Sequence, residues 1–489
     1  MKIVQIARGV TYGDGASECV LLLADLFDEW KYENIIMARV TDTRLDDSRI
    51  RKFRQISDIH FEKDDIIIYH FCDGDELNYE VECLSNKKIL IFQNITPPEY
   101  SRSFDPIGVK AHLLGEYDIK HTAAHYISCI TMSEFSKSNL VDAGWNPQGV
   151  HVIPLITGKW KEVIADSETV KSLKDGWINF LFTGRIAPNK KIEDIIRIFS
   201  YYNNHVNEKS RLVLVGEALY SCYKSALDKY ILNHKNKNVF FAGHVSYEVL
   251  EAYYQTADIF LCMSEHEGFC IPLIEAMKRQ IPVIAYRAAA VPDTLGNAGI
   301  LVDTKNEQEV CRIIDQILSD PDWKKELLQK QSQRVESYNI YTFKDQIKTI
   351  IEEIISCQDW KYEEDEEIVT YIKEAYNEER EKIVYILSDI DIETEVVVYG
   401  NGLVGKALID RLPLKEKRRI KAICDNGVQE KEYQTIPILK HEECIEQYPK
   451  ATYVITPQHQ IVGIIRDLLQ SGINTEQIKI YEAFKKVLL

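Results

Sequence analysis

Short runs of apolar, largely β-branched residues alternate with helix-forming patterns along most of the chain. Continuous runs of this kind predict parallel strands that are covered on both faces, because a strand with one solvated face would alternate in polarity. With helices between them, such strands predict a doubly wound α/β domain. The first six runs are residues 2–7, 34–39, 65–71, 88–93, 129–132 and 150–155.

A chain of 489 residues is too long for one hydrophobic core, so we expect two or three domains. The polar stretch 157–175 interrupts the pattern, and two further sets of strand-like runs follow it. The second set is 178–184, 211–216, 238–243, 257–263, 282–286 and 299–303, and the third is 395–399, 419–424, 452–456 and 479–481. We expect α/β domains over 1–156 and 157–340, a helical return segment and charged connector over 341–392, and a small Rossmann-like domain over 393–489.

The formal net charge of −17 argues against a nucleic-acid partner, because an acidic surface repels polyanions. Eleven cysteines lie singly, without a CxxC pair, which predicts neither a disulfide framework nor a zinc site and favours a reducing compartment. The first residues read as a strand and not as a signal peptide. We therefore expect a cytoplasmic protein; peripheral attachment to the inner face of the membrane and the oligomeric state stay open.

The segment 264–277, SEHEGFCIPLIEAM, carries the strongest signal and follows an apolar run directly. Gly268 permits a tight turn, and Pro272 suits the first turn of a helix. Glu267 is then in the loop, and Glu275 is about one turn inside the helix. The free N–H groups of the loop and first turn predict an anion site, with a diphosphate as the guest. The alternative is that the two glutamates only favour the start of the helix electrostatically.

A second segment, 182–191 (FTGRIAPNKK), follows the first strand of the same predicted domain. Arg185 and Lys190 are expected to project toward the edge of the sheet where the glutamate loop begins. Two cations beside a helix N-terminus can hold a diphosphate without a metal ion. The alternative reading of this pair alone is two solvated loop cations.

The pattern of Gly184, Arg185 and Lys190 followed by Glu267 and Glu275 strongly resembles retaining glycosyltransferase family 4 of the GT-B fold, in its bacterial polysaccharide-type members. The resemblance covers roughly residues 1–355. It implies two Rossmann-like domains that face a cleft. It also implies that the two cations neutralise the donor diphosphate, that Glu275 holds the ribose and that Glu267 contacts the transferred sugar.

The resemblance extends to further positions. It places the nucleotide base near the backbone of Val245. The remaining donor-site residues that it indicates are Gly13, Asp14, Gly15, Gly184, Gly216, Gly268, Phe269, Cys270 and Ile271. On the acceptor side it indicates Asn94 and Ser133. Many family members carry a histidine near the reaction centre in this half, and His70 is the candidate here, with a core histidine as the alternative.

The implied reaction is metal-independent transfer, with retention, from a UDP- or GDP-sugar to a glycan or lipid-linked acceptor in surface polysaccharide or glycoconjugate synthesis. We expect no required cofactor and no metal ligands. Asp73 and Asp75 form the nearest string to a metal-binding Asp-x-Asp, and we interpret them as part of a loop. Attack by the acceptor hydroxyl on the front face, with the departing phosphate oxygen as base, follows from retention.

The third predicted domain begins with a strand that runs into GxGxxG, formed by Gly400, Gly402 and Gly405. Asp425 ends the next strand, where a ribose-binding acid belongs in a dinucleotide site. A NAD-like ligand is therefore one hypothesis for this domain. Two other functions stay open: a non-catalytic nucleotide-sugar or carbohydrate binding protein, and a redox or epimerase activity of this third domain.

Overall fold

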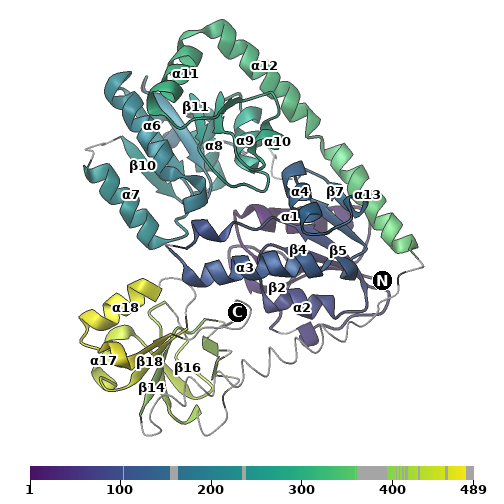
Figure 1. The fold of residues 1–489 in the computed structure, drawn as a ribbon, viewed down its shortest axis with the longest axis vertical. Coiled ribbons are helices and arrows are strands. Elements are labelled where there is room, and N and C mark those ends of the chain that lie inside the picture. The colour runs from purple at the N-terminus through teal and green to yellow at the C-terminus, as the bar shows by residue number, and fades with distance from the viewer. Residues whose placement is uncertain are drawn as a thin grey trace. The chain divides into compact units, whose positions relative to one another are not determined.

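Figure 1 shows the chain as a computed structural model. The structure describes residues 1–54, 56–102, 104–154, 163–233, 238–357, 360, 394–402, 405, 406, 408, 409, 412, 417–427, 430–456 and 461–480. The chain divides into two compact units. One unit comprises residues 1–100 and 112–363, and the other comprises residues 101–111 and 364–489.

The first unit begins with a seven-stranded sheet in the order β3-β2-β1-β4-β5-β6-β7, in which every pair of neighbours is parallel. Its strands are β1 (Ile3–Val10), β2 (Asn34–Thr41), β3 (Ile50–Lys52), β4 (Ile66–Phe71), β5 (Lys87–Phe92), β6 (Ser128–Thr131) and β7 (Val150–Val152). The helices between them are α1 (Gly15–Glu29), α2 (Glu76–Glu82), α3 (Pro106–His121) and α4 (Glu134–Asp142). All six residues of β4 are buried, as expected of a central strand that is covered on both faces.

The same unit holds a second parallel sheet, in the order β10-β9-β8-β11-β12-β13. Its strands are β8 (Ile178–Thr183), β9 (Ser210–Val215), β10 (Val239–Gly243), β11 (Ile259–Cys262), β12 (Val283–Tyr286) and β13 (Ile300–Val302). The helices are α5 (Ser167–Leu173), α6 (Ile192–His205), α7 (Ser221–Asn233), α8 (Tyr247–Thr256), α9 (Ile271–Lys278), α10 (Val291–Leu295) and α11 (Glu307–Ser319). The order reverses between β8 and β11, and the loops after these two strands carry the predicted site.

Two long helices, α12 (Pro321–Ser337) and α13 (Ile340–Ser356), follow the second sheet. α13 returns to the first sheet, along β5 and β7 (Figure 1). The side chain of Lys87 in β5 donates hydrogen bonds to the carbonyls of Ile354 and Ile355 in the last turn of α13, at 2.9 and 3.0 Å. Lys344 forms an ion pair with Glu29 of α1. The C-terminal helix of this unit is thus tied to its N-terminal sheet.

The second unit contains a smaller sheet in the order β16-β17-β15-β14-β18-β19. Its strands are β14 (Val396–Tyr399), β15 (Ile420–Cys424), β16 (Glu432–Tyr433), β17 (Ile436–Leu439), β18 (Thr452–Ile455) and β19 (Ile478–Ile480), and its helices include α17 (His441–Gln447) and α18 (Ile461–Gln470). Only β16 and β17 pair antiparallel among the described strands. This sheet buries its own apolar residues on both faces.

The predicted fold class, two doubly wound α/β sheets and a smaller third one, is confirmed. Each predicted strand lies within three residues of an observed one at either end. The short strands β3, β16 and β17 were not predicted. The boundary after residue 156 and most of the connector fall outside the described residues, so the domain limits stay predictions. None of the described helices combines the length and apolar character needed to cross a bilayer.

Candidate active site

The loop after β11 leads directly into α9, as the sequence predicted. Cys270 precedes α9 with a left-handed backbone (φ 71°), and Pro272 occupies its first turn. Glu267 is in the loop with 8% of its surface exposed. Glu275 is one turn inside the helix. The two glutamates are therefore placed at the N-terminal end of one helix.

Lys190 meets Glu267 in this loop. Its Nζ atom is 2.5 Å from Oε2 of Glu267, and the two side chains are 14% and 9% exposed. Burial alone would raise the pKa of Glu267, but the charge of Lys190 and its hydrogen bond hold that pKa below the ordinary value. Glu267 is thus a buried carboxylate whose charge is stabilised chiefly by the ammonium group of Lys190.

The two loops are also tied through Asn189. Its carbonyl accepts from the backbone N–H of Glu265 at 2.9 Å, and its side-chain amide donates to the carbonyl of His266 at 3.1 Å. Arg185, in the loop after β8, is exposed and forms no ion pair with any residue that the structure describes. One of the two predicted cations is therefore already paired, and the other faces solvent.

Glu275 is held by a tyrosine that the sequence did not single out. The hydroxyl of Tyr254 in α8 donates to Oε2 of Glu275 at 2.8 Å, and this hydroxyl is also 2.7 Å from Oγ1 of Thr183. Burial raises the pKa of Glu275. Tyr254 fixes one carboxylate oxygen, and the other, Oε1, has no hydrogen-bond partner among the described residues.

The backbone N–H groups from Gly268 to Ile271 form an unsatisfied set. None of them donates to another residue in the described part of the chain. Four such groups at a helix start attract an anion, because the helix dipole adds to their partial positive charge. The predicted phosphate donors are therefore available.

Asn94, in the loop after β5, and Ser133, the N-cap of α4, lie beside the same loop. Oγ of Ser133 donates to the carbonyl of Gly268 at 2.7 Å, and Oγ of Ser136 donates to it at 3.2 Å. The amide of Asn94 donates to Ser136 at 2.7 Å. A side chain on Gly268 would come within 2.9 Å of the Cβ atom of Asn94, so the glycine is required for this approach. Ser133 therefore contacts the glutamate loop directly, and Asn94 is linked to it through Ser136.

The loop after β1 also meets the second sheet's loops. A Cβ atom on Gly13 (φ 76°) would come within 2.8 Å of the ring of His244, and one on Gly15 within 3.2 Å of Ile271. Val245 is half-buried beside that histidine. Asp14 is used differently: its carboxylate caps α1 by accepting from Ser17 at 3.0 Å. Asp14 therefore caps α1, and its contact with the donor stays a prediction.

Gly216, at the end of β9, packs against the loop after β8. A Cβ atom there would be 2.0 Å from the carbonyl oxygen of Gly184, and both glycines have φ of 138°. Close approach of these two backbones sets the start of the loop that carries Arg185. Packing of the two backbones therefore requires glycine at position 216, and contact of Gly184 and Gly216 with the donor stays a prediction.

His70 does not have the surroundings of an acceptor-side histidine. It is 4% exposed, and its Nε2 atom is 2.9 Å from Oε1 of Gln5 on β1. Burial lowers its pKa to about 3. These observations favour the alternative of a core histidine.

A second histidine, His112 of α3, was not singled out from the sequence and contacts the Asp-x-Asp string. Its Nδ1 atom is 3.1 Å from a carboxylate oxygen of Asp73, and both side chains are about 15% exposed. Asp75 instead caps α2 and pairs with Arg39 at 2.9 Å. Both carboxylates of the Asp-x-Asp string thus have protein partners. Only the loop position of Asp73 after β4 could have drawn attention to this pair.

The glycine-rich loop of the second unit uses its acidic residue internally. Oδ2 of Asp425 accepts from the backbone N–H of Asn401 at 2.8 Å, and Oδ1 accepts from that of Gly427 at 2.9 Å. Gly405 packs against Gly400, where a Cβ atom would be 2.0 Å from the carbonyl oxygen. Gly402 has open space at that position. Each oxygen of Asp425 thus accepts one backbone hydrogen bond within the loop, and a NAD-like ligand here stays a prediction.

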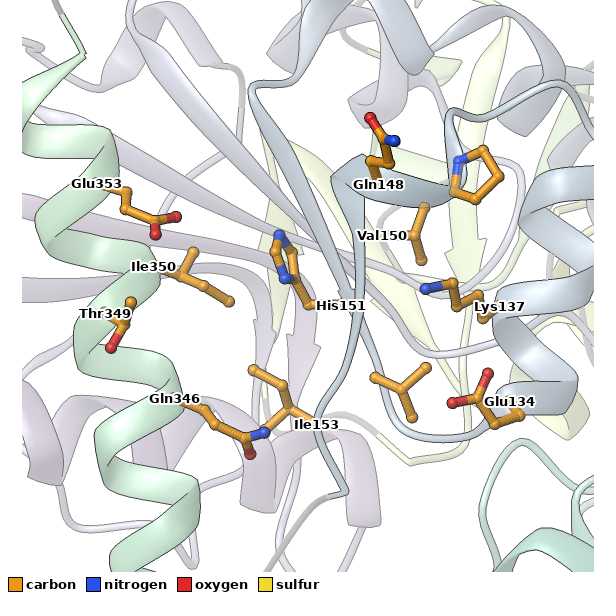
Figure 2. Close-up of a pocket in the computed structure, with 12 residues that line it drawn as sticks. Glu134, Lys137, Gln148, Val150, His151, Ile153, Gln346, Thr349, Ile350 and Glu353 are labelled. Atoms are coloured by element: carbon orange, nitrogen blue, oxygen red, sulfur yellow. The ribbon is translucent and has the colours of Figure 1, made fainter.

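A cavity of about 510 Å³ lies between α13 and the segment around β7. Figure 2 shows His151 at its centre, with Glu353 of α13 on one side and Lys137 of α4 on the other. Burial lowers the pKa of His151, an effect that Glu353 opposes. No predicted site residue lines this cavity, although Ser133 immediately precedes its first lining residue, Glu134.

Residues 165–338 match the model of the family described as glycosyl transferases group 1. The O-antigen chain mannosyltransferase B of Escherichia coli is 25% identical over 146 residues, which are 29% of this chain and 38% of that protein. The alpha-monoglucosyldiacylglycerol synthase of Acholeplasma laidlawii is 32% identical over 179 residues, 34% of this chain and 42% of that protein. The chain thus spans less than half the length of these curated relatives.

Among solved structures, Anabaena HepE in complex with UDP and glucose superposes with a TM-score of 0.58 at 16% identity, over 72% of this chain and 99% of that one. This likeness confirms the GT-B fold. The family match indicates that residues 165–338 are similar to the glycosyl transferases group 1 domain.

Proposed function

We propose, with the group 1 domain at residues 165–338 as the premise, that the chain is a retaining, metal-independent glycosyltransferase of family 4. The observation that carries the proposal is the buried Lys190–Glu267 pair at the start of α9. A carboxylate that is kept ionised at a positively biased helix end suits a site for a sugar attached to a diphosphate.

The donor would bind with its diphosphate on Arg185, Lys190 and the N–H groups from Gly268 to Ile271. These groups stabilise the charge that develops on the leaving phosphate, and preorganised donors of this kind supply most of the acceleration in such reactions. Glu275, held by Tyr254, accepts from the ribose. Glu267 accepts from hydroxyls of the transferred sugar.

The acceptor hydroxyl would attack on the face from which the diphosphate departs, and the leaving phosphate oxygen takes its proton. The bond from the anomeric carbon to the phosphate oxygen breaks as the bond to the acceptor oxygen forms. Asn94 and Ser133 hold the glutamate loop from the acceptor side. No step requires a metal ion.

The names of the relatives support the substrate class. One is a mannosyltransferase of O-antigen chains and another makes a glucosylated lipid. We therefore propose a UDP- or GDP-sugar as donor and a glycan or lipid-linked acceptor in surface polysaccharide or glycoconjugate synthesis. A cytoplasmic location, at or near the inner face of the membrane, follows from that role.

The first test is thermal unfolding of the full chain with GDP-mannose, UDP-glucose and UDP-N-acetylglucosamine. A donor at a hundred times its dissociation constant should add about 2.7 kcal/mol of stability. Transfer is then measured with the stabilising donor, with and without EDTA, and the product's anomeric configuration is read by NMR. A donor that binds but never turns over would favour a non-catalytic binding protein, and loss of turnover in EDTA would contradict the metal-free mechanism.

A further inference from the structure

Two cysteines flank Glu267 in the loop between β11 and α9. Cys262 ends β11, and Cys270 immediately precedes α9. The two sulfur atoms and a carboxylate oxygen of Glu267 all lie within 4.8 Å of one another. It is the one such group of three potential metal ligands among the residues that the structure describes.

The spacing of these atoms suits one tetrahedral ion. Zinc binds thiolate sulfur at about 2.3 Å, so two sulfurs on one zinc ion are about 3.8 Å apart. Because the three atoms lie within 4.8 Å of one another, shortening the sulfur–sulfur separation to about 3.8 Å requires a movement of at most about 1 Å. Two sulfur donors select thiophilic ions such as Zn²⁺ or Cd²⁺ over Mg²⁺ or Mn²⁺.

The ligand set is also held in advance by the surrounding fold. The three side chains are 1%, 8% and 8% exposed, for Cys262, Glu267 and Cys270 respectively. Two hydrogen bonds fix the loop between the cysteines. The hydroxyl of Ser133 donates to the carbonyl of Gly268 at 2.7 Å, and the backbone N–H of Ala290 donates to the carbonyl of Glu267 at 3.3 Å. A site whose ligands need little ordering binds an ion at low entropic cost.

Charge balance permits the ion in this buried place. The two cysteines are free, and Glu267 forms an ion pair with Lys190, so the four side chains carry no net formal charge. A divalent ion that displaces both thiol protons leaves the same net charge. Lys190 then pairs with a metal group of charge −1, and no uncompensated charge is buried.

We propose that Cys262, Glu267 and Cys270 form a binding site for a thiophilic divalent ion, and that its occupancy blocks sugar transfer. The blockade rests on the proposed function, because it removes Glu267 from contact with the donor sugar. Binding itself does not depend on that function. The site would make transfer sensitive to free zinc or cadmium while the reaction needs no metal.

Binding is tested with the full chain, reduced and freed of metal by dialysis against a chelator, in a background with the exposed Cys72 and Cys222 replaced by alanine. Cd²⁺ should bind one equivalent and produce the ultraviolet thiolate-to-cadmium band of two thiolates. Cys262→Ala and Cys270→Gly should each weaken binding by at least about tenfold and halve the band.

Cys270→Gly guards against loss of folding, because glycine adopts the left-handed backbone of this position without strain. Cys311→Ala is the matched control, since Cys311 is a buried cysteine of α11, away from the glutamate loop, and its thiol donates to the carbonyl of Ile198 in α6. It should bind Cd²⁺ as the parent does. Absence of the band, or a band that survives both Cys262→Ala and Cys270→Gly, would overturn the site.

Activity provides the second readout. Cd²⁺ should inhibit transfer by the parent, EDTA should restore it, and the remaining turnover of Cys262→Ala should be insensitive. Binding without inhibition would overturn the blockade. Absence of turnover with every donor would instead contradict the proposed function, and the band would still test the metal site. Thiol titration that finds a disulfide between Cys262 and Cys270 after mild reduction would also overturn the proposal.

Discussion

Replacing Lys190 by alanine tests the electrostatics of the site most directly. In the parent, the ammonium group is 2.5 Å from Glu267, and the carboxylate is 8% exposed. The variant leaves that carboxylate buried without a counter-charge. Its pKa should rise, because burial raises it and the opposing charge of Lys190 is gone.

The size of the effect follows from the burial of both partners. Removing one member of a buried ion pair costs about 3–5 kcal/mol. The compact unit that contains the pair comprises residues 1–100 and 112–363, so at about 2.1 cal/mol/K of unfolding entropy per residue, 1 kcal/mol moves Tm by about 1.4 °C and Lys190→Ala should lower Tm by about 4–7 °C. Turnover should fall by about 100-fold to 1,000-fold, because the same ammonium group stabilises the leaving diphosphate.

The neighbouring lysine supplies the matched control. Lys191 is 27% exposed and lies 3.3 Å from Glu265, so Lys191→Ala should cost no more than about 1 kcal/mol. A second variant, Lys190→Ala with Glu267→Gln, removes the uncompensated charge and should regain most of the lost stability without regaining turnover. Both quantities are measured by thermal unfolding and by a transfer assay with the stabilising donor.

Two results would refute the reasoning. The first is a Lys190→Ala variant that unfolds within about 2 °C of the parent. The second is a double variant as unstable as the single one, because the loss would then come from packing of the lysine stem and not from charge.

Three further outcomes are expected. Gly216→Ala should lose about 3 kcal/mol or more, because its Cβ atom would meet the Gly184 carbonyl, whereas Gly149→Ala has open space and should unfold like the parent. Burial lowers the pKa of His266 to about 4, so the unfolded chain alone takes up its proton as the pH falls below 6.5. The free energy of unfolding should therefore fall by about 3 kcal/mol between pH 6.5 and 4. In the His266→Gln variant this contribution should be absent, which is measured by denaturant unfolding at a series of pH values. Ser133→Ala should cost about 1 kcal/mol in denaturant unfolding by removing a hydrogen bond to Gly268, and an unchanged midpoint would contradict that contact.

The strands could be predicted because central parallel strands such as β4 are apolar without interruption. The edge strand β3 was missed because it has only three residues, two of them charged. Lys190 and Glu267 could be assigned to one edge because parallel strands end together. Their direct contact could not be predicted, since a sequence carries no distance between residues 77 positions apart.

Prediction of the site from the sequence was also limited by residue types that commonly have either a structural or a ligand-binding role. An aspartate at the start of a helix can bind a ligand or cap the helix, and Asp14 caps α1. A histidine at a strand end can face a substrate or the core, and the burial of His70 favours the core. In each case the deciding partner, Ser17 or Gln5, is supplied by the fold.

The return of α13 to the first sheet has a consequence for how the protein is made. The seventh strand of that sheet leaves the ribosome long before α13, whose buried residues Phe343, Ile347, Ile350 and Ile354 pack within the same unit. At about 5–20 residues per second, roughly 10 to 40 seconds of synthesis separate the two. During that interval the nascent sheet carries apolar surface without its final cover. The N-terminal sheet is therefore translated first, but its packing is completed only after α13 has been made.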